Sequence, residues 1–150
     1  MKIVPNANAE AVVSALAARI LARIGRNMPV LLLVSGGTCE DAAIGVLSTV
    51  ANSLAQERGK LKMLFTFGLT DERFGETGHQ DSIWRQLIDK GLDPSLCNMM
   101  PILADAHDKK DDLDEAVVRY NEFLSLAIRK RAEGKLFIAT LLGIGEDGHI

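Results

Sequence analysis

The chain has 150 residues, of which 47% are hydrophobic and 25% are charged, and its formal net charge is -3. This composition is that of an ordinary globular protein and excludes a disordered or fibrous chain. The slightly negative balance gives no overall field that would attract nucleic acid or an anionic membrane, so we expect neither as a partner.

The cysteines and the N-terminus indicate a reducing compartment. Cys39 and Cys97 stand in no spacing typical of a disulfide framework or a zinc site, so we predict two free thiols. Residues 1–10 lack the basic and apolar regions of a signal peptide, and no apolar run reaches the roughly 18 residues of a membrane span. We therefore expect a soluble, cytoplasmic protein with a single α/β domain over residues 1–150.

The periodicity of apolar residues predicts alternating helices and strands along the chain. In chain order, the expected elements are a helix over 9–25, a strand over 29–37, a helix over 39–59, a strand over 60–73, a short helix over 81–91, a weak strand over 98–103, a helix that begins near Asp112, and a strand over 135–145. This alternation predicts an open, mainly parallel sheet with helices on both faces, a Rossmann-like α/β fold.

Three polar clusters directly follow strands of this predicted sheet. They are "SGGT" at 35–38, "TDERFG" at 70–75 and "GEDGHI" at 145–150. Ligands of open α/β sheets bind beyond the carboxyl ends of the strands. We therefore expect the three clusters to converge at one edge of the sheet, although they lie far apart in the sequence.

The first cluster, Ser35, Gly36, Gly37 and Thr38, stands between a buried strand and the start of a helix. Glycines let the backbone approach a ligand closely, and free N–H groups at a helix N-terminus attract an anion such as phosphate. From this motif alone two interpretations stay open: a phosphate site, or paired glycines that only form a tight turn. The motif is neither a Walker A loop nor a dinucleotide-binding G-x-G-x-x-G.

The second cluster contains Asp71, Glu72 and Arg73. By itself, such a run is more often a solvated group of charges at a strand end. At a ligand-binding edge, the arginine could hold a phosphate or carboxylate with two hydrogen bonds, and a carboxylate could orient or deprotonate a sugar.

The third cluster places Asp147 and His149 on either side of Gly148. Histidine titrates near neutral pH and can act as a general base toward water. The competing interpretation is a surface histidine in a polar loop, which is how we interpret His79 and His107. The position of His149 at a strand end, among glycines and near an acid, favours a catalytic role.

These motifs, in this order, resemble the 6-phosphogluconolactonase family, which is similar in turn to the glucosamine-6-phosphate deaminases. "SGGT" resembles the family's SGG-S/T loop, "TDERFG" its DER segment, "DSIW" its D-S-N segment and "LLGIGEDGHI" its LG-x-G-x-DGH signature. The resemblance extends from about residue 10 to the end. The SGG sequence and Arg73 are closer to the lactonase branch, whereas Ile150 is more typical of deaminases.

The resemblance implies a fold of the sugar-phosphate isomerase/lactonase type and metal-independent hydrolysis of 6-phosphogluconolactone in the pentose phosphate pathway, without a cofactor. His149 would draw a proton from the attacking water, and Asp147 would position its loop. Asp71 and Glu72 would hold sugar hydroxyls or fix the neighbouring arginine. The residues that would bind the phosphate are Ser35, Gly36, Gly37, Thr38 and Arg73.

Two alternatives stay open. In a glucosamine-6-phosphate deaminase or related isomerase, Asp71 would be the base that moves a proton between sugar carbons, and His149 would assist ring opening. The third possibility, a non-catalytic sugar-phosphate-binding module or decayed relative, is suggested by departures from the family pattern at Cys39, Glu40 and Ile83. In particular, the carboxylate of Glu40 would oppose phosphate binding unless its side chain points away.

Family members continue past the DGH signature with further strands and helices. The resemblance therefore implies that residues 1–150 are the N-terminal portion of a longer family domain. For these residues in isolation we expect weak activity or none. The sequence leads to no expectation about the oligomeric state.

Overall fold

Helices and strands alternate along most of the chain. The structure is a computed structural model, and it describes residues 8–75, 78–103 and 110–144. The elements are α1 (Ala9–Ile24), β1 (Val30–Val34), the 3-10 turn η1 (Gly37–Cys39), α2 (Glu40–Ser53), the 3-10 turn η2 (Ala55–Glu57), α3 (Arg58–Leu64), β2 (Phe65–Leu69), α4 (Ile83–Asp89), β3 (Asn98–Met100), α5 (Lys110–Ala132) and β4 (Phe137–Leu141).

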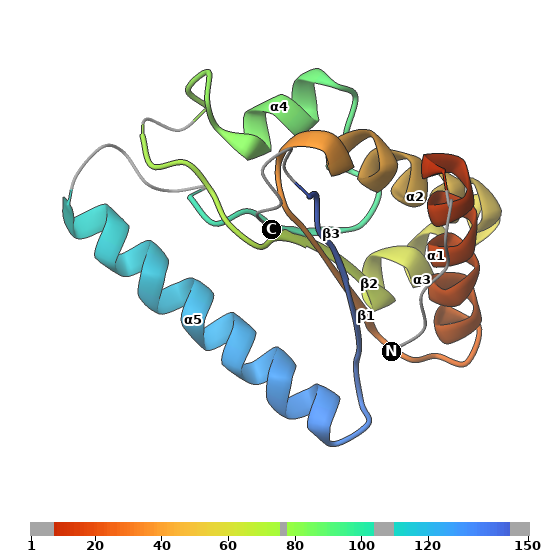
Figure 1. Cartoon of the computed structure of the whole chain (residues 1–150). Coiled ribbons are helices and arrows are strands. Elements are labelled where there is room, and N and C mark those ends of the chain that lie inside the picture. Colours follow the sequence, from red (N-terminus) through yellow and green to blue (C-terminus); the bar gives the residue numbers. More distant parts are fainter. Residues whose placement is uncertain (1–7, 76–77, 104–109, 145–150) are drawn as a thin grey trace.

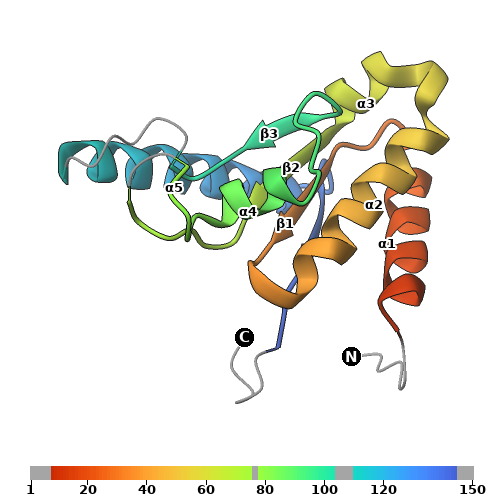
Figure 2. The same cartoon turned by 90° about the horizontal axis from the view of Figure 1, so that it is seen from above.

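The four strands form one parallel sheet in the order β3-β2-β1-β4. Figures 1 and 2 show α1 and α2 on one side of this sheet and α5 on the other. The predicted fold class, a parallel α/β sheet with helices on both faces, is therefore confirmed.

The face covered by α1 and α2 contains most of the buried core. Alternate residues of a strand point to the same face, and on this face Val30, Leu32, Phe65 and Phe67 are at most 1% exposed. They pack in one cluster with apolar residues of the helices, such as Ile20 of α1. Burial of each such side chain contributes roughly 1.5–3 kcal/mol. The strands that precede the first two polar clusters are thus anchored in a packed core.

The opposite face is in contact with α5 around Gly68. A Cβ at Gly68 would lie 3.2 Å from both Leu33 Cδ2 and Tyr120 Oη, so the missing side chain leaves the space that α5 occupies. The hydroxyl of Tyr120 donates a hydrogen bond to the carbonyl oxygen of Leu69. Burial raises the pKa of this hydroxyl to about 12. Tyr120 therefore ties α5 to the carboxyl end of β2.

The segment between α2 and β2 differs from the prediction. The helix expected over 39–59 ends at Ser53, and the strand expected from residue 60 begins only at Phe65 because α3 intervenes. Leu61 and Leu64 of α3 are both buried, and their spacing of three residues places them on one face of a helix. The apolar residues that suggest a strand there are thus the buried face of a short helix.

Helix α5 also begins earlier than predicted. It starts at Lys110, so Asp112 lies within its first turn and not at its N-cap. Acidic residues are favourable both at the cap and in the first turn, so composition does not distinguish the two positions.

Among the described residues, no helix combines the length and apolar character needed to cross a membrane.

Both cysteines have free thiols, as predicted, and both are buried. Burial raises the pKa of Cys97 to about 12, which keeps this thiol protonated and unreactive at neutral pH. Cys39 lies directly after the first glycine loop and contributes to the packing of that loop, described below.

Candidate active site

The carboxyl ends of β1, β2 and β4 lie at the same level of the sheet. In the register, Val34 of β1 pairs with both Leu69 of β2 and Leu141 of β4. The pairing continues one residue further, because Ser35 N donates to Leu141 O at 3.1 Å and Thr70 N donates to Val34 O at 2.9 Å. Loops that are far apart in the sequence therefore leave the sheet side by side.

A cleft of about 700 Å³ lies between these loops, a volume within the usual range for a small-molecule site. It is lined by Ser35, Gly36, Gly37, Thr38, Thr70, Asp71, Arg73, Leu142, Gly143 and Ile144. The structure thus brings the first two predicted clusters together, with the start of the third loop beside them. Asp147 and His149 lie outside the described residues.

The two glycines of the first loop serve different purposes. A Cβ at Gly36 would lie 2.8 Å from Ile83 Cγ1, so this glycine allows close contact between the loop and α4. Gly37 has free space around it but a φ of 82°, a left-handed conformation that strains other residues. The start of α2 therefore lies at the edge of the cleft, because Gly36 allows close packing on α4 and Gly37 allows a sharp turn.

Ser35 connects the first loop to the third. Its Oγ accepts a hydrogen bond from Gly143 N at 3.1 Å and lies 3.4 Å from Cys39 Sγ, which itself donates to Ser35 O at 2.9 Å. A Cβ at Gly143 would be only 3.0 Å from Thr38 Oγ1. The segment that leads toward Asp147 therefore enters the cleft in direct contact with the first loop.

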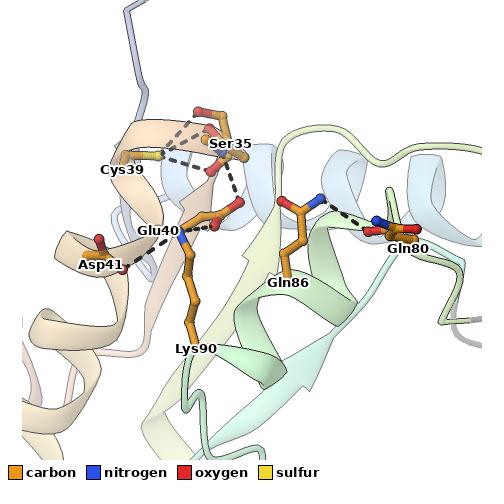
Figure 3. A network of polar contacts seen from close by, with 9 residues as sticks. Ser35, Cys39, Glu40, Asp41, Gln80, Gln86 and Lys90 are labelled. Atoms are coloured by element: carbon orange, nitrogen blue, oxygen red, sulfur yellow. Dashed lines mark hydrogen bonds and ion pairs between the residues drawn. The ribbon is translucent and has the colours of Figure 1, made fainter.

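The carboxylate of Glu40 is turned away from the cleft. Its side chain is 1% exposed, and its Oε1 accepts a hydrogen bond from Gly37 N at 2.9 Å. Its Oε2 lies 2.8 Å from the ammonium nitrogen of Lys90, which follows α4. Figure 3 shows Lys90 reaching across from α4 to this carboxylate. The acid that follows the first loop in the sequence is thus buried and paired with the partly exposed ammonium group of a lysine that no sequence pattern connects to it.

Asp71 and Arg73 line the cleft on the side of β2. Both residues are exposed. Asp71 Oδ1 accepts a hydrogen bond from Thr70 Oγ1 at 2.9 Å, which orients the carboxylate. No ion pair between the Arg73 guanidinium and a carboxylate occurs among the described residues. A guanidinium can hold a phosphate or carboxylate with two hydrogen bonds.

Glu72 does not line the cleft but holds the second loop against α4. Its carboxylate accepts hydrogen bonds from Arg73 N at 2.7 Å, Ile83 N at 2.7 Å, Trp84 N at 3.1 Å and Ser82 Oγ at 3.2 Å. These contacts satisfy N–H groups that the start of a helix leaves without partners. Of the sequence-based roles, fixing Arg73 fits this position better than contact with a sugar.

His79 also fixes the second loop, although the sequence indicates only a surface histidine at this position. Its Nδ1 accepts a hydrogen bond from Asp81 N at 3.2 Å, so the hydrogen is on Nε2, which donates to Arg73 O at 2.9 Å. A Cβ at Gly75 would lie 2.7 Å from the imidazole ring. The ring therefore packs against the loop that carries Arg73, and only the proximity of His79 to the DER segment in the sequence could have suggested this.

The described part of the cleft combines a helix start, three hydroxyls, a guanidinium and a carboxylate. Helix N-termini and arginine attract phosphate, while hydroxyls and a carboxylate suit the hydroxyl groups of a sugar. No group of three or more histidine, cysteine, aspartate or glutamate side chains that could hold a metal is present among the described residues. Fold and cleft define an α/β protein whose candidate ligand site lies at the carboxyl edge of a parallel sheet.

The chain belongs to the glucosamine-6-phosphate isomerases/6-phosphogluconolactonase family, whose model matches residues 4–150. The predicted superfamily is therefore confirmed. The family is one of enzymes, and its name covers both of the activities considered from the sequence. No curated protein matches the chain closely enough to be counted as a relative.

Proposed function

We propose that the protein hydrolyses 6-phosphogluconolactone to 6-phosphogluconate. The observation that carries the proposal is a single cleft that is lined by Ser35, Gly36, Gly37 and Thr38 and also by Arg73. An arginine and a glycine loop at a helix start, when both line one cleft, are suited to bind a phosphate group. Family membership supplies the sugar phosphate as the substrate class.

In this proposal the phosphate is bound between the two loops, and the ring extends toward the third. The Thr38 hydroxyl and the backbone at the start of α2 hold the phosphate on one side, and Arg73 holds it on the other. Binding energy from the phosphate orients the lactone carbonyl for attack. His149, on the segment that follows Gly143, takes a proton from water as the water attacks the carbonyl carbon. The bond between this carbon and the ring oxygen then breaks, and the ring oxygen takes the proton from His149 to become a hydroxyl of the product. Asp147 positions that segment.

The test is hydrolysis of 6-phosphogluconolactone by the purified protein above the rate in buffer. His149→Ala should lower the turnover number about 100-fold or more, with a smaller effect on KM, because a general base acts on the reaction step. Arg73→Ala should mainly raise KM, whereas Arg85→Ala, on the exposed surface of α4, is the matched control. An unchanged turnover number in His149→Ala would overturn the assignment of the base.

The position of Asp71 supports a second candidate, a glucosamine-6-phosphate deaminase or isomerase. Its carboxylate lies in the cleft and is oriented by Thr70, and a carboxylate in that position can move a proton between sugar carbons. Release of ammonia from glucosamine 6-phosphate, abolished by Asp71→Asn, would favour this activity. Binding of sugar phosphates with neither reaction would indicate a non-catalytic binding module.

A further inference from the structure

Glu40 is unusual because it is a carboxylate buried directly behind a loop that faces an anion site. Its side chain is 1% exposed at the first position of α2. The cleft does not include it, although its chain neighbours in the first loop line the wall. A buried charge of this kind requires hydrogen bonds and a counter-charge.

Two groups satisfy this carboxylate. Gly37 N donates to Oε1 at 2.9 Å, and Lys90 Nζ lies 2.8 Å from Oε2. Lys90 also lies 3.7 Å from Asp41 Oδ1, so it faces two acidic side chains of the first turn of α2 (Figure 3). The hydrogen bond to Glu40 is the main cause that raises the pKa of Lys90 above 10.5, so the ammonium stays charged at neutral pH.

The contact between Glu40 and Gly37 has a consequence for anion binding. The Gly37 N–H is directed to an internal carboxylate, so a ligand in the cleft must be held by the remaining groups of the wall, including Thr38 and Arg73. The same bond helps to hold Gly37 at its φ of 82°. The shape of the loop therefore depends on Glu40, while its electrostatic potential depends on whether the charge of Glu40 is compensated.

We propose that Lys90 is a positioning residue for the anion site: its ammonium group neutralises Glu40 and Asp41, so that the loop formed by Ser35, Gly36, Gly37 and Thr38 can accept a phosphate. The proposal rests on the proposed function, because it concerns the same cleft. Without the ammonium group, the buried carboxylate of Glu40 behind the loop and the exposed carboxylate of Asp41 near it would have no counter-charge and would repel a phosphate dianion. Lys90 lies outside the cleft and acts only through Glu40 and Asp41.

The experiment measures the affinity for inorganic phosphate and for 6-phosphogluconate by titration calorimetry at low ionic strength. Lys90→Met should weaken both about fivefold, whereas Lys90→Arg should bind within about twofold of the wild type. Glu40→Gln keeps an oxygen acceptor for Gly37 N and should bind as tightly as the wild type or slightly tighter. In the double variant Glu40→Gln/Lys90→Met, most of the lost affinity should return, because the buried charge is gone.

Two further measurements separate this charge effect from a loss of structure. At an ionic strength of about 1 M, the difference between wild type and Lys90→Met should shrink, because screening acts on charge repulsion. The amide signal of Gly37 in NMR should shift in Glu40→Gln and move less in Lys90→Arg. A Lys90→Met variant with wild-type affinity, or a double variant as weak as Lys90→Met, would overturn the proposal.

The two probes distinguish failure of this inference from failure of the proposed function. Phosphate binding that depends on Lys90, without hydrolysis of the lactone, supports the inference and rejects the hydrolase. Hydrolysis with a KM that Lys90→Met leaves unchanged supports the hydrolase and rejects the inference. Absence of binding for both phosphate and 6-phosphogluconate rejects both.

Discussion

Both loops that form the walls of the cleft are held by a glutamate, but the two glutamates are satisfied in different ways. Glu40 holds the first loop through one backbone N–H, and its charge is balanced by the ammonium group of Lys90. Glu72 holds the second loop and is satisfied by three backbone N–H groups and a hydroxyl, two of the N–H groups at the start of α4.

This difference means that the second loop is held by groups of fixed position, whereas the first loop depends on a flexible side chain. Backbone donors at a helix start are fixed by the helix, so the position of Glu72 follows from the fold. Lys90 has a flexible side chain that is 44% exposed, so the balance of charge at Glu40 responds to pH and salt. Helix α4 contributes to the support of both loops. Its first residues donate hydrogen bonds to Glu72, and Lys90, which follows the helix, pairs with Glu40.

The largest effect is expected for Glu72→Ala. This change leaves three backbone N–H groups and the Ser82 hydroxyl without their acceptor, so we expect a loss of about 3 kcal/mol in the free energy of unfolding. Glu72→Gln retains an oxygen acceptor and should lose about half as much. Urea denaturation measures both, with Glu133→Ala as the control because that carboxylate pairs with Lys135 on the surface. A loss below about 1 kcal/mol in Glu72→Ala would mean that α4 holds its position without this carboxylate.

The next effect distinguishes the two glycines of the first loop. Gly36→Ala must displace Ile83, with an expected loss of about 2 kcal/mol, whereas Gly37→Ala meets no atom within 4 Å and should lose about 1 kcal/mol from backbone strain. Ile83→Val should relieve part of the cost of Gly36→Ala and none of the cost of Gly37→Ala. Thermal unfolding of the single and double variants measures this, and equal rescue of both would contradict separate roles.

The smallest effect is expected for the pH dependence of the Glu40–Lys90 pair. Because the folded state raises the pKa of Lys90 above 10.5, the stability from the pair is complete below pH 10.5 and is lost as the pH rises through the folded-state pKa. The stability difference between wild type and Lys90→Met should therefore be constant near neutral pH and decrease in this alkaline range. Tyr120 and Cys97 ionise in both proteins, so their effects cancel. If the stability difference between wild type and Lys90→Met stays constant from neutral pH through the alkaline range, charge is not the stabilising factor.

The sequence predicted much of the fold because the relevant signals are local. The run from Val30 to Val34 is fully apolar, as a strand covered on both faces requires, and Ala17, Ile20 and Ile24 recur on one face of α1. The segment around Leu61 and Leu64 was assigned wrongly because a short apolar run has the same composition in a helix and in a strand.

The sequence also placed the first two polar clusters at strand ends, and parallel register then brought them together in the cleft. The orientation of the acids could not be predicted in the same way. Glu72 is adjacent to Asp71 and Arg73 in the sequence, yet only these two neighbours line the cleft, because the Glu72 side chain turns to the start of α4.

The sequence alone therefore determined most of the order of the elements, the sheet edge at which the first two polar clusters meet, and the family, since each depends on the type and spacing of neighbouring residues. Only the tertiary structure showed that Glu40 is buried against Lys90 and that Ser35 contacts Gly143. These contacts join residues far apart in the sequence, and they depend on how α4 packs beside α2 and on how β4 lies beside β1. Packing of this kind leaves no periodic pattern in the chain, because each contact joins a single residue of one segment to a single residue of another.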